Sequence, residues 1–213
     1  MDNLVCMNFL AHLYLSGDEP LVMLGNFIAD GVKGKQWMKY PKQVQYGIKM
    51  HRFIDNYTDV HPLISNAKKQ LYPFFSKYAG AVLDMYHDHF IANQWSVIHH
   101  EQLLMYTHYC YRIFYTHYEL LPPKYKHMLP YMSQRNWLFN YKNLAGLHRS
   151  FTGLSKRIVN NPGIEHGAQI LENNYLFFAN HHHEFWPELC NAVLKWKSSH
   201  PFPDKGVNNS LVF

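Results

Sequence analysis

The chain has 213 residues, which is enough for one domain with a substantial hydrophobic core. Hydrophobic residues make up 47% of it and aromatic residues 16%, so the composition excludes a disordered chain. The formal net charge is +5, but the basic residues are scattered. This pattern argues against a nucleic-acid partner and fits an enzyme with acidic or phosphorylated partners.

Neither a membrane span nor a secretion signal is expected. No apolar run approaches the roughly 18 residues of a transmembrane helix, and the first residues lack the charged, apolar and small-residue order of a signal peptide. The three cysteines, Cys6, Cys110 and Cys190, are far apart and follow no metal-binding spacing. We therefore expect a protein of the reducing cytoplasm without a membrane partner.

Gly and Pro divide a sequence of nearly continuous helical periodicity into segments. Residues 17–20 separate a first helix from a second, which ends within residues 30–34. A third helix is predicted over residues 41–59, and Pro62 suits the first turn of the fourth. Residues 78–80 precede a fifth helix.

In the second half, apolar and aromatic residues recur at helical spacing across residues 106–117, which predicts a core-facing helix. A last helix is predicted over residues 165–197, with a kink before Pro187. The tail from residue 198 is rich in Pro and Gly and is expected to be irregular. No segment alternates as a strand would, so we expect one all-α domain, a helical bundle over residues 1–213.

Two short stretches, residues 51–55 and 84–89, place ionisable residues four positions apart, on one face of a helix. In each stretch that face continues an apolar stripe. Imidazoles and carboxylates that point into a core need partners, and one metal ion can serve several of them. The alternatives are a solvated Asp88 and a helix-surface pair between His51 and Asp55, worth roughly 0.2–0.5 kcal/mol.

Other predicted helices add further candidates to these two stretches. The full set of imidazoles and carboxylates is His12, Asp30, His51, Asp55, Asp59, Asp84, Asp88 and His89. Such a mixed set suits Mn²⁺, Fe²⁺, Zn²⁺ or Mg²⁺, and an ion of this kind lowers the pKa of bound water and neutralises phosphate oxygens. Lys33 and Arg52 lie nearby in the sequence and would neutralise phosphate charge.

Several short segments of the chain form a pattern that is specific when they are taken together. In the first half they are Met7–Leu13 (MNFLAHL), Gly25–Asp30 (GNFIAD), His51–Asp55 (HRFID) with Thr58–Asp59, and Asp84–Phe90 (DMYHDHF) with Trp95. In the second half they are Asn136–Leu138 with Tyr141, Gly153–Ser155 with Arg157, and Phe185–Leu189. This pattern resembles the acyl carrier protein phosphodiesterases, also called acyl carrier protein hydrolyases, and the resemblance covers about residues 7–197.

The resemblance implies an all-α fold, distantly like the HD-domain phosphohydrolases, and a metal-dependent phosphodiesterase that uses a divalent ion, Mn²⁺ first. It implies removal of 4′-phosphopantetheine from a serine of holo acyl carrier protein, an acidic protein substrate. The metal ligands are then expected among Asp30, His51, Asp55, Asp84 and Asp88. Lys33 and Arg52 would stabilise the phosphate charge, and His12 or His89 would protonate the departing serine.

Two positions depart from the family pattern. Residues 1–6 precede the usual start of the family, and His87 stands where an aromatic residue is expected. Because His87 is rotated off the line of Asp84 and Asp88, we expect it outside the site.

Two alternatives remain open at this stage. One is a metal phosphohydrolase for a nucleotide or another small phosphoester, because its metal ligands would look the same. The other is a non-catalytic helical binding protein without a tightly bound metal. The sequence holds no nucleophile elbow, no Gly-x-Gly-x-x-Gly pattern and no Walker A loop.

Overall fold

The computed structural model describes residues 9–203, and all regular structure within that range is helical, which confirms the predicted all-α class. The α-helices of this range are α1 (Phe9–Ser16), α2 (Pro20–Ile28), α3 (Lys42–Val60), α4 (Pro62–Phe75), α5 (Ala79–Asn93), α6 (Trp95–Ile98), α7 (Leu103–Thr116), α8 (Pro123–Gln134), α9 (Trp137–Asn140), α10 (Leu144–Ser155), α11 (Gly167–Asn173) and α12 (Tyr175–Ser199). Short 3₁₀ turns are η1 (Ala29–Gly31), η2 (Gly34–Lys39), η3 (Ser76–Tyr78), η4 (Tyr118–Leu120) and η5 (Ile164–His166).

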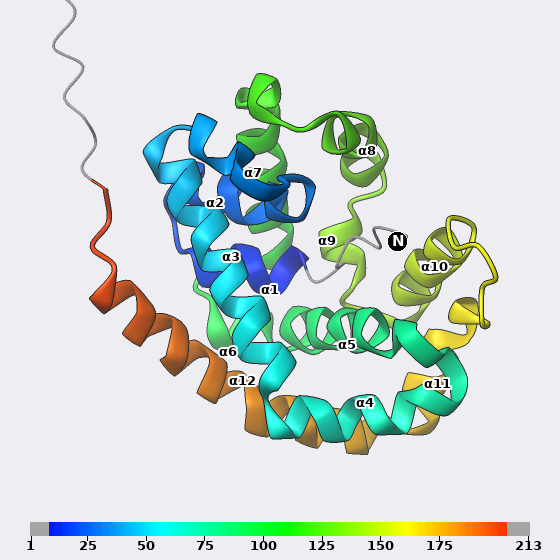
Figure 1. Cartoon of the computed structure of the whole chain (residues 1–213). Helices are drawn as coiled ribbons and strands as arrows, with labels where there is room; N and C mark the ends of the chain where they lie inside the picture. Colours follow the sequence, from blue (N-terminus) through cyan, green and yellow to red (C-terminus); the bar gives the residue numbers. More distant parts are fainter. Residues whose placement is uncertain (1–8, 204–213) are drawn as a thin grey trace, which may run out of the picture.

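Helix α5 lies in the middle of the molecule (Figure 1). Helix α1 packs against α2, α3 and α5, while α12 packs along α3, α4 and α5. Helices α7, α8 and α9 contact one another, and α10 packs on α11. No helix of the described range is both long enough and apolar enough to cross a bilayer.

The predicted boundaries of the first half agree with the structure to within about two residues. The chain turns between α1 and α2 at Gly17, whose φ of 76° is costly for any residue with a side chain. Helix α4 begins at Pro62, where the missing N–H costs no helical hydrogen bond. The second helix ends at Ile28, and Asp30 lies in the η1 turn that follows.

The single last helix predicted over residues 165–197 is wrong, because the chain leaves helical geometry at Asn174 between α11 and α12. Asn174 has φ −126°, and its Nδ2 donates to the carbonyl of Ile170 at 2.9 Å, which satisfies a terminal carbonyl of α11. Helix α12 then continues through Pro187 to Ser199.

The prediction of an irregular tail from residue 198 is wrong for its first residues, because α12 continues to Ser199 and His200 is packed. The His200 ring stacks on Trp196 with ring centroids 4.4 Å apart, and its carbonyl accepts from the Tyr46 hydroxyl at 3.1 Å. The first residues after α12 are therefore packed against α3. The remainder of the predicted tail, from residue 204, lies outside the described residues.

Helices α2 and α3 approach each other backbone to backbone. A Cβ on Gly25 would lie 2.2 Å from the carbonyl oxygen of Val44, and a Cβ on Gly47 would lie 2.2 Å from that of Val22. Only glycine fits at both positions of this crossing. Asn26 follows Gly25 directly and His51 lies one turn beyond Gly47, so the crossing brings these two polar side chains together.

Candidate metal centre

Three side chains from α1 and α3 converge on one point. The possible ligand atoms of His12, His51 and Asp55, which we call the His–His–Asp group, all lie within 4.8 Å of one another. Asp55 Oδ1 is 3.3 Å from His12 Nε2, and Asp55 Oδ2 is 3.1 Å from His51 Nε2. The two imidazole rings stack with centroids 4.1 Å apart. Helical spacing in α3 supplies His51 and Asp55, and packing of α1 adds His12.

Asp30 extends this group from the η1 turn. Its Oδ1 lies 3.1 Å from His51 Nε2, so this nitrogen faces two carboxylates. The carboxylates are partly exposed, with 26% of the Asp30 side chain and 31% of the Asp55 side chain accessible, whereas both histidines are buried. The group is therefore closed on its imidazole side and open to solvent on its carboxylate side.

Asn26 sets the orientation of both imidazoles. Its Oδ1 lies 2.7 Å from His12 Nδ1 and 3.1 Å from His51 Nδ1. Its Nδ2 donates to the His12 carbonyl and to Ser16 Oγ, which fixes the direction of the amide. An amide oxygen can only accept, so each Nδ1 donates to it and each Nε2 is turned toward the carboxylates.

Sequence reasoning passed over Asn26 as a functional residue. A signal was available, because Asn26 lies four positions before Asp30, the same spacing that drew attention to His51 and Asp55. Metal-ligating imidazoles commonly donate their second ring N–H to an acceptor behind them, and the Asn26 amide oxygen has that position here.

The His–His–Asp group fits a divalent cation. His12 Nε2 is buried and has no hydrogen-bond partner, because Asp55 lies outside hydrogen-bond geometry. A buried imidazole nitrogen with a free lone pair, next to a second Nε2 and two carboxylates, is a donor set that Mn²⁺, Fe²⁺ or Zn²⁺ accepts.

The protonation of the site without a metal also favours a bound cation. Burial opposes a charge on His51, but its hydrogen bonds with Asp30 and Asp55 outweigh burial and raise its pKa to about 9. Burial also acts against ionised Asp55, yet the close approach of the His12 and His51 rings holds the pKa of Asp55 well below the usual range. Burial and the neighbouring His51 lower the pKa of His12. Without metal, a proton on His51 provides the positive charge that a bound cation would supply.

Metal-free protein should therefore lose stability at alkaline pH. The pKa of folded His51, about 9, lies above its ordinary value of 6.5, so its contribution is complete below pH 6.5 and is lost as the pH rises through 9. We expect the Tm difference between wild type and His51→Gln, both in EDTA, to shrink from about pH 6.5 to about pH 10. A Tm difference independent of pH would show that His51 is not protonated in the metal-free site.

Asp88 has a different environment from the one expected of a metal ligand. It is fully buried on α5, where Oδ2 accepts from the Leu10 N–H at 3.0 Å and Oδ1 from the Ala11 N–H at 2.8 Å. Burial raises the pKa of Asp88, and these two hydrogen bonds oppose the rise. Its carboxylate thus holds the N-terminus of α1, immediately before His12. It is not a member of the His–His–Asp group.

The remaining acidic and imidazole candidates are also outside the group. Asp84 lies one turn before Asp88 on α5. His89 Nδ1 donates to the Tyr141 carbonyl at 2.8 Å, and its Nε2 lies 3.2 Å from the Tyr175 hydroxyl. Asp59 pairs with Lys68 of α4 at 2.9 Å on the surface. The described contacts join none of these three to His12, His51 or Asp55.

The two phosphate-binding candidates lie next to the η1 turn, Arg52 through a contact and Lys33 through its position in the chain. Arg52 follows His51 on α3, and its Nη2 donates to the Val32 carbonyl at 3.3 Å. Lys33 follows Val32 and is exposed. Both cations therefore border the turn that carries Asp30.

His87 is outside the group, in agreement with its helical angle. Its Nδ1 lies 2.9 Å from Nδ1 of His182 on α12, in the core between α5 and α12. Burial lowers the pKa of His87 to about 3 and the pKa of His182 well below its ordinary value, so this pair is neutral at physiological pH.

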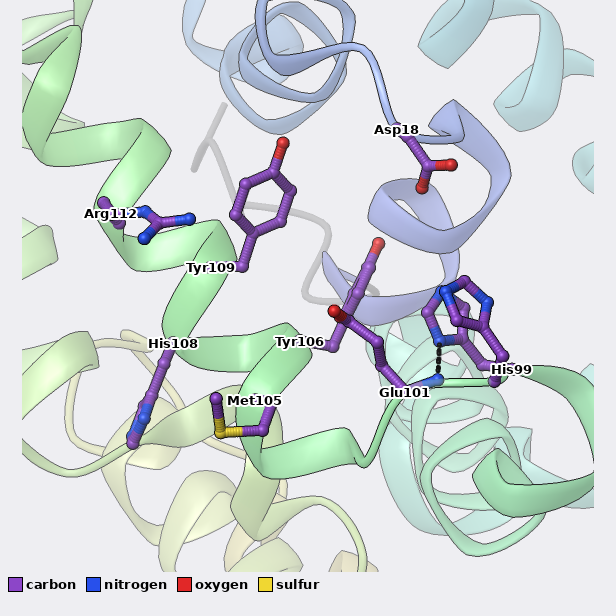
Figure 2. A pocket seen from close by; sticks show the side chains of 9 residues that line it. Asp18, His99, Glu101, Met105, Tyr106, His108, Tyr109 and Arg112 are labelled. Carbon is purple, nitrogen blue, oxygen red and sulfur yellow. Dashed lines mark hydrogen bonds between the residues drawn. The ribbon is translucent and has the colours of Figure 1, made fainter.

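A cavity of about 460 Å³ lies away from the group, between α7, the turn after α1 and the loop after α6 (Figure 2). Figure 2 shows the rings of Tyr106 and Tyr109 directed toward the turn that carries Asp18, with His99 beside them. His99 Nδ1 accepts from the Glu101 N–H at 3.1 Å. Within residues 9–203, only the His–His–Asp group brings three possible ligands to one point, so this cavity lacks the convergence of a metal centre.

Comparison with known proteins gives one consistent family. A family model described as acyl carrier protein phosphodiesterase matches residues 7–189. The acyl carrier protein phosphodiesterase of Photorhabdus laumondii subsp. laumondii is 30% identical over 197 residues, which cover 88% of this chain and 95% of that protein. That of Enterobacter sp. (strain 638) is 29% identical over 189 residues, covering 86% and 95%. That of Salmonella agona is 31% identical over 152 residues, covering 71% and 79%.

No solved structure matches the chain, and the likeness to HD-domain phosphohydrolases stays a prediction. The family match begins at Met7, where the resemblance in the sequence also begins. Residues 1–6 lie outside both the match and the described residues.

Proposed function

The chain belongs to the acyl carrier protein phosphodiesterase family, and we propose that it hydrolyses the phosphodiester that joins 4′-phosphopantetheine to a serine of holo acyl carrier protein. The products are the apo protein and free phosphopantetheine. The His–His–Asp group carries this proposal, because two oriented imidazoles and a carboxylate with an open side suit metal-assisted phosphodiester hydrolysis.

His12, His51 and Asp55 would hold the ion, with Asp30 beside them. When bound, a divalent cation polarises the phosphate oxygens and lowers the pKa of water. The mixed nitrogen and oxygen donors favour Mn²⁺, Fe²⁺ or Zn²⁺ over Mg²⁺, which prefers oxygen ligands, and Mn²⁺ is our first choice. The chain's own contribution is orientation, since the Asn26 carbonyl holds both Nε2 atoms toward the open side.

Arg52 and Lys33 would bind the non-bridging oxygens of the phosphodiester. Both border the η1 turn, and the guanidinium of Arg52 can make two parallel hydrogen bonds to a phosphate. Positioned cations stabilise the charge that develops on phosphorus-bound oxygens in the transition state.

Replacing Arg52 with Gln should lower kcat/KM by about 10²-fold on holo acyl carrier protein and on a small diester alike, because both carry the same phosphate charge. Gln keeps an N–H donor for the Val32 carbonyl, so the fold should persist. Steady-state kinetics with both substrates checks this expectation. A rate loss confined to the protein substrate would instead make Arg52 a docking residue.

We do not include Asp84 or Asp88 among the proposed metal ligands, and we do not propose His89 as the proton donor. Asp88 has both oxygens engaged by the backbone of α1, and His89 has both nitrogens engaged inside the protein. A metal-bound His12 has no proton to give from Nε2. Solvent reaches the open carboxylate side of the group, so water can protonate the departing serine.

The proposal is tested by intact mass spectrometry of holo acyl carrier protein incubated with the purified chain and Mn²⁺. We expect loss of the phosphopantetheine mass in Mn²⁺ and no loss in EDTA. Parallel reactions contain a nucleoside monophosphate or bis(p-nitrophenyl) phosphate. Consumption of the nucleotide with intact holo protein would favour the small-phosphoester alternative. No reaction together with no bound metal would favour a non-catalytic binding protein.

A further inference from the structure

A second site of concentrated charge lies between α9 and α10. It is a pocket of about 80 Å³, lined by Arg135, Arg149 and Arg157 together with Trp137, Asn140 and Gly153. No residue of its lining is acidic. A pocket with three guanidinium groups and no carboxylate in its lining attracts anions.

Neutral groups fix the walls of this pocket. Arg149 Nη2 donates to Asn140 Oδ1 at 3.3 Å, and Asn140 Nδ2 donates to the Arg135 carbonyl at 2.6 Å. The Arg157 guanidinium lies over the Trp137 ring, 5.9 Å from its centroid, and its Nε donates to the Gly153 carbonyl at 3.2 Å. These contacts hold the side chains of Arg149 and Arg157 in place through neutral groups.

The pocket is connected to the metal centre through the first turn of α8. The η1 turn packs directly on α8, since a Cβ on Gly31 would lie 2.5 Å from the Tyr125 ring. Lys124 precedes Tyr125. Burial and the positive charges of Arg157 and Lys33 lower the pKa of Lys124 and the Asp30 charge raises it, so Lys124 lies within electrostatic range of both the pocket and the η1 turn.

We call these positive charges together the basic surface, and its members are Lys33, Lys124, Arg157, Arg149 and Arg135. A basic surface with five members carries more positive charge than a single phosphodiester needs. Arg135, directly after α8, and Arg149, on α10, are both exposed, so a protein-sized ligand can reach them.

We propose that this basic surface docks acidic side chains of the protein substrate while its phosphodiester reaches the metal centre. The inference rests on the proposed function and adds a partner surface to it. Exposed arginines spread over two helices suit several carboxylates on one protein face better than one small anion. Docking by the outer arginines should act on KM, because these residues do not contact the reacting phosphate.

The test uses two charge reversals in the full chain, Arg135→Glu and Arg149→Glu. Lys195→Glu is the matched control, because Lys195 is exposed on the C-terminal part of α12, on the opposite side of the molecule from α10 (Figure 1). Each variant is assayed with holo acyl carrier protein and with bis(p-nitrophenyl) phosphate. Arg149→Gln is included because Arg149 also contacts Asn140, and thermal melting reports whether each variant is folded.

We expect each reversal to raise KM for holo acyl carrier protein about tenfold, with kcat within about twofold of wild type. Lys195→Glu and all rates on the small diester should be unchanged. The KM effect of Arg135→Glu should diminish at high salt.

An unchanged KM in folded Arg135→Glu and Arg149→Gln would overturn the docking surface while leaving the proposed function intact. An equal increase in KM in Lys195→Glu would show that the effect comes from the net charge of the protein and not from the basic surface. Equal losses on the small diester would make the pocket part of the phosphate site. A wild type that leaves holo acyl carrier protein intact would instead overturn the proposed function.

Discussion

Asp55→Asn is expected to lower kcat on holo acyl carrier protein by at least about 10³-fold and to remove the bound metal. Both oxygens of Asp55 face imidazole Nε2 atoms, at 3.3 Å from His12 and 3.1 Å from His51. Asn keeps the shape but has one acceptor oxygen and no charge, so the site loses a ligand and half of its compensating negative charge. Metal content by mass spectrometry of the native protein and single-turnover kinetics measure the two effects.

Asp59→Asn is the control for this substitution. Asp59 lies one turn further along α3, on the surface, where it pairs with Lys68. Exposed ion pairs of this kind contribute little, so we expect wild-type metal content and a kcat within about twofold of wild type. An Asp55→Asn variant that stays active with bound metal would remove Asp55 from the centre.

Asp88→Ala is expected to lower the free energy of unfolding by about 2–5 kcal/mol, because it leaves two buried N–H groups of α1 without an acceptor. Asp88→Asn keeps one acceptor oxygen and should cost less. Urea denaturation of both variants in EDTA measures the loss. Because Asp88 holds the helix that carries His12, a weakened metal affinity should accompany the loss of stability.

Comparing the loss of stability with the loss of metal affinity shows whether Asp88 has a structural role or is a metal ligand. Asp88→Asn should keep its metal at saturating Mn²⁺ and most of its kcat. If Asp88→Asn loses its metal while its unfolding free energy equals that of wild type, Asp88 is a metal ligand, as the sequence pattern first suggested.

The part of the site that lies on α3 was predictable from the sequence. The other residues of the site reach it through contacts between distant segments, which the sequence pattern does not show. Helical spacing alone puts His51 and Asp55 on one inward face. The same spacing turns Asp88 toward the core, but it cannot say which atoms Asp88 meets there. Those atoms belong to Leu10 and Ala11, more than 70 positions away in the chain.

The same distinction applies to the fold: features set by local backbone preferences were predicted, and features set by contacts between distant residues were not. Pro62 and Gly17 mark helix boundaries because their backbone preferences act locally. The break at Asn174 was missed because apolar periodicity continues across it, while one asparagine side chain bonds back to Ile170 and ends α11. The approach of α2 and α3 at Gly25 and Gly47 depends on two distant glycines facing each other.

The central claim is that His12, His51 and Asp55 bind the catalytic metal. Its most direct test is an anomalous difference map from crystals of the protein grown with Mn²⁺. We expect a peak at roughly 2.0–2.3 Å from His12 Nε2, His51 Nε2 and an Asp55 oxygen, with Asn26 still contacting both Nδ1 atoms. A peak beside Asp84 and Asp88, or no peak in crystals of protein that is active with Mn²⁺, would contradict this assignment.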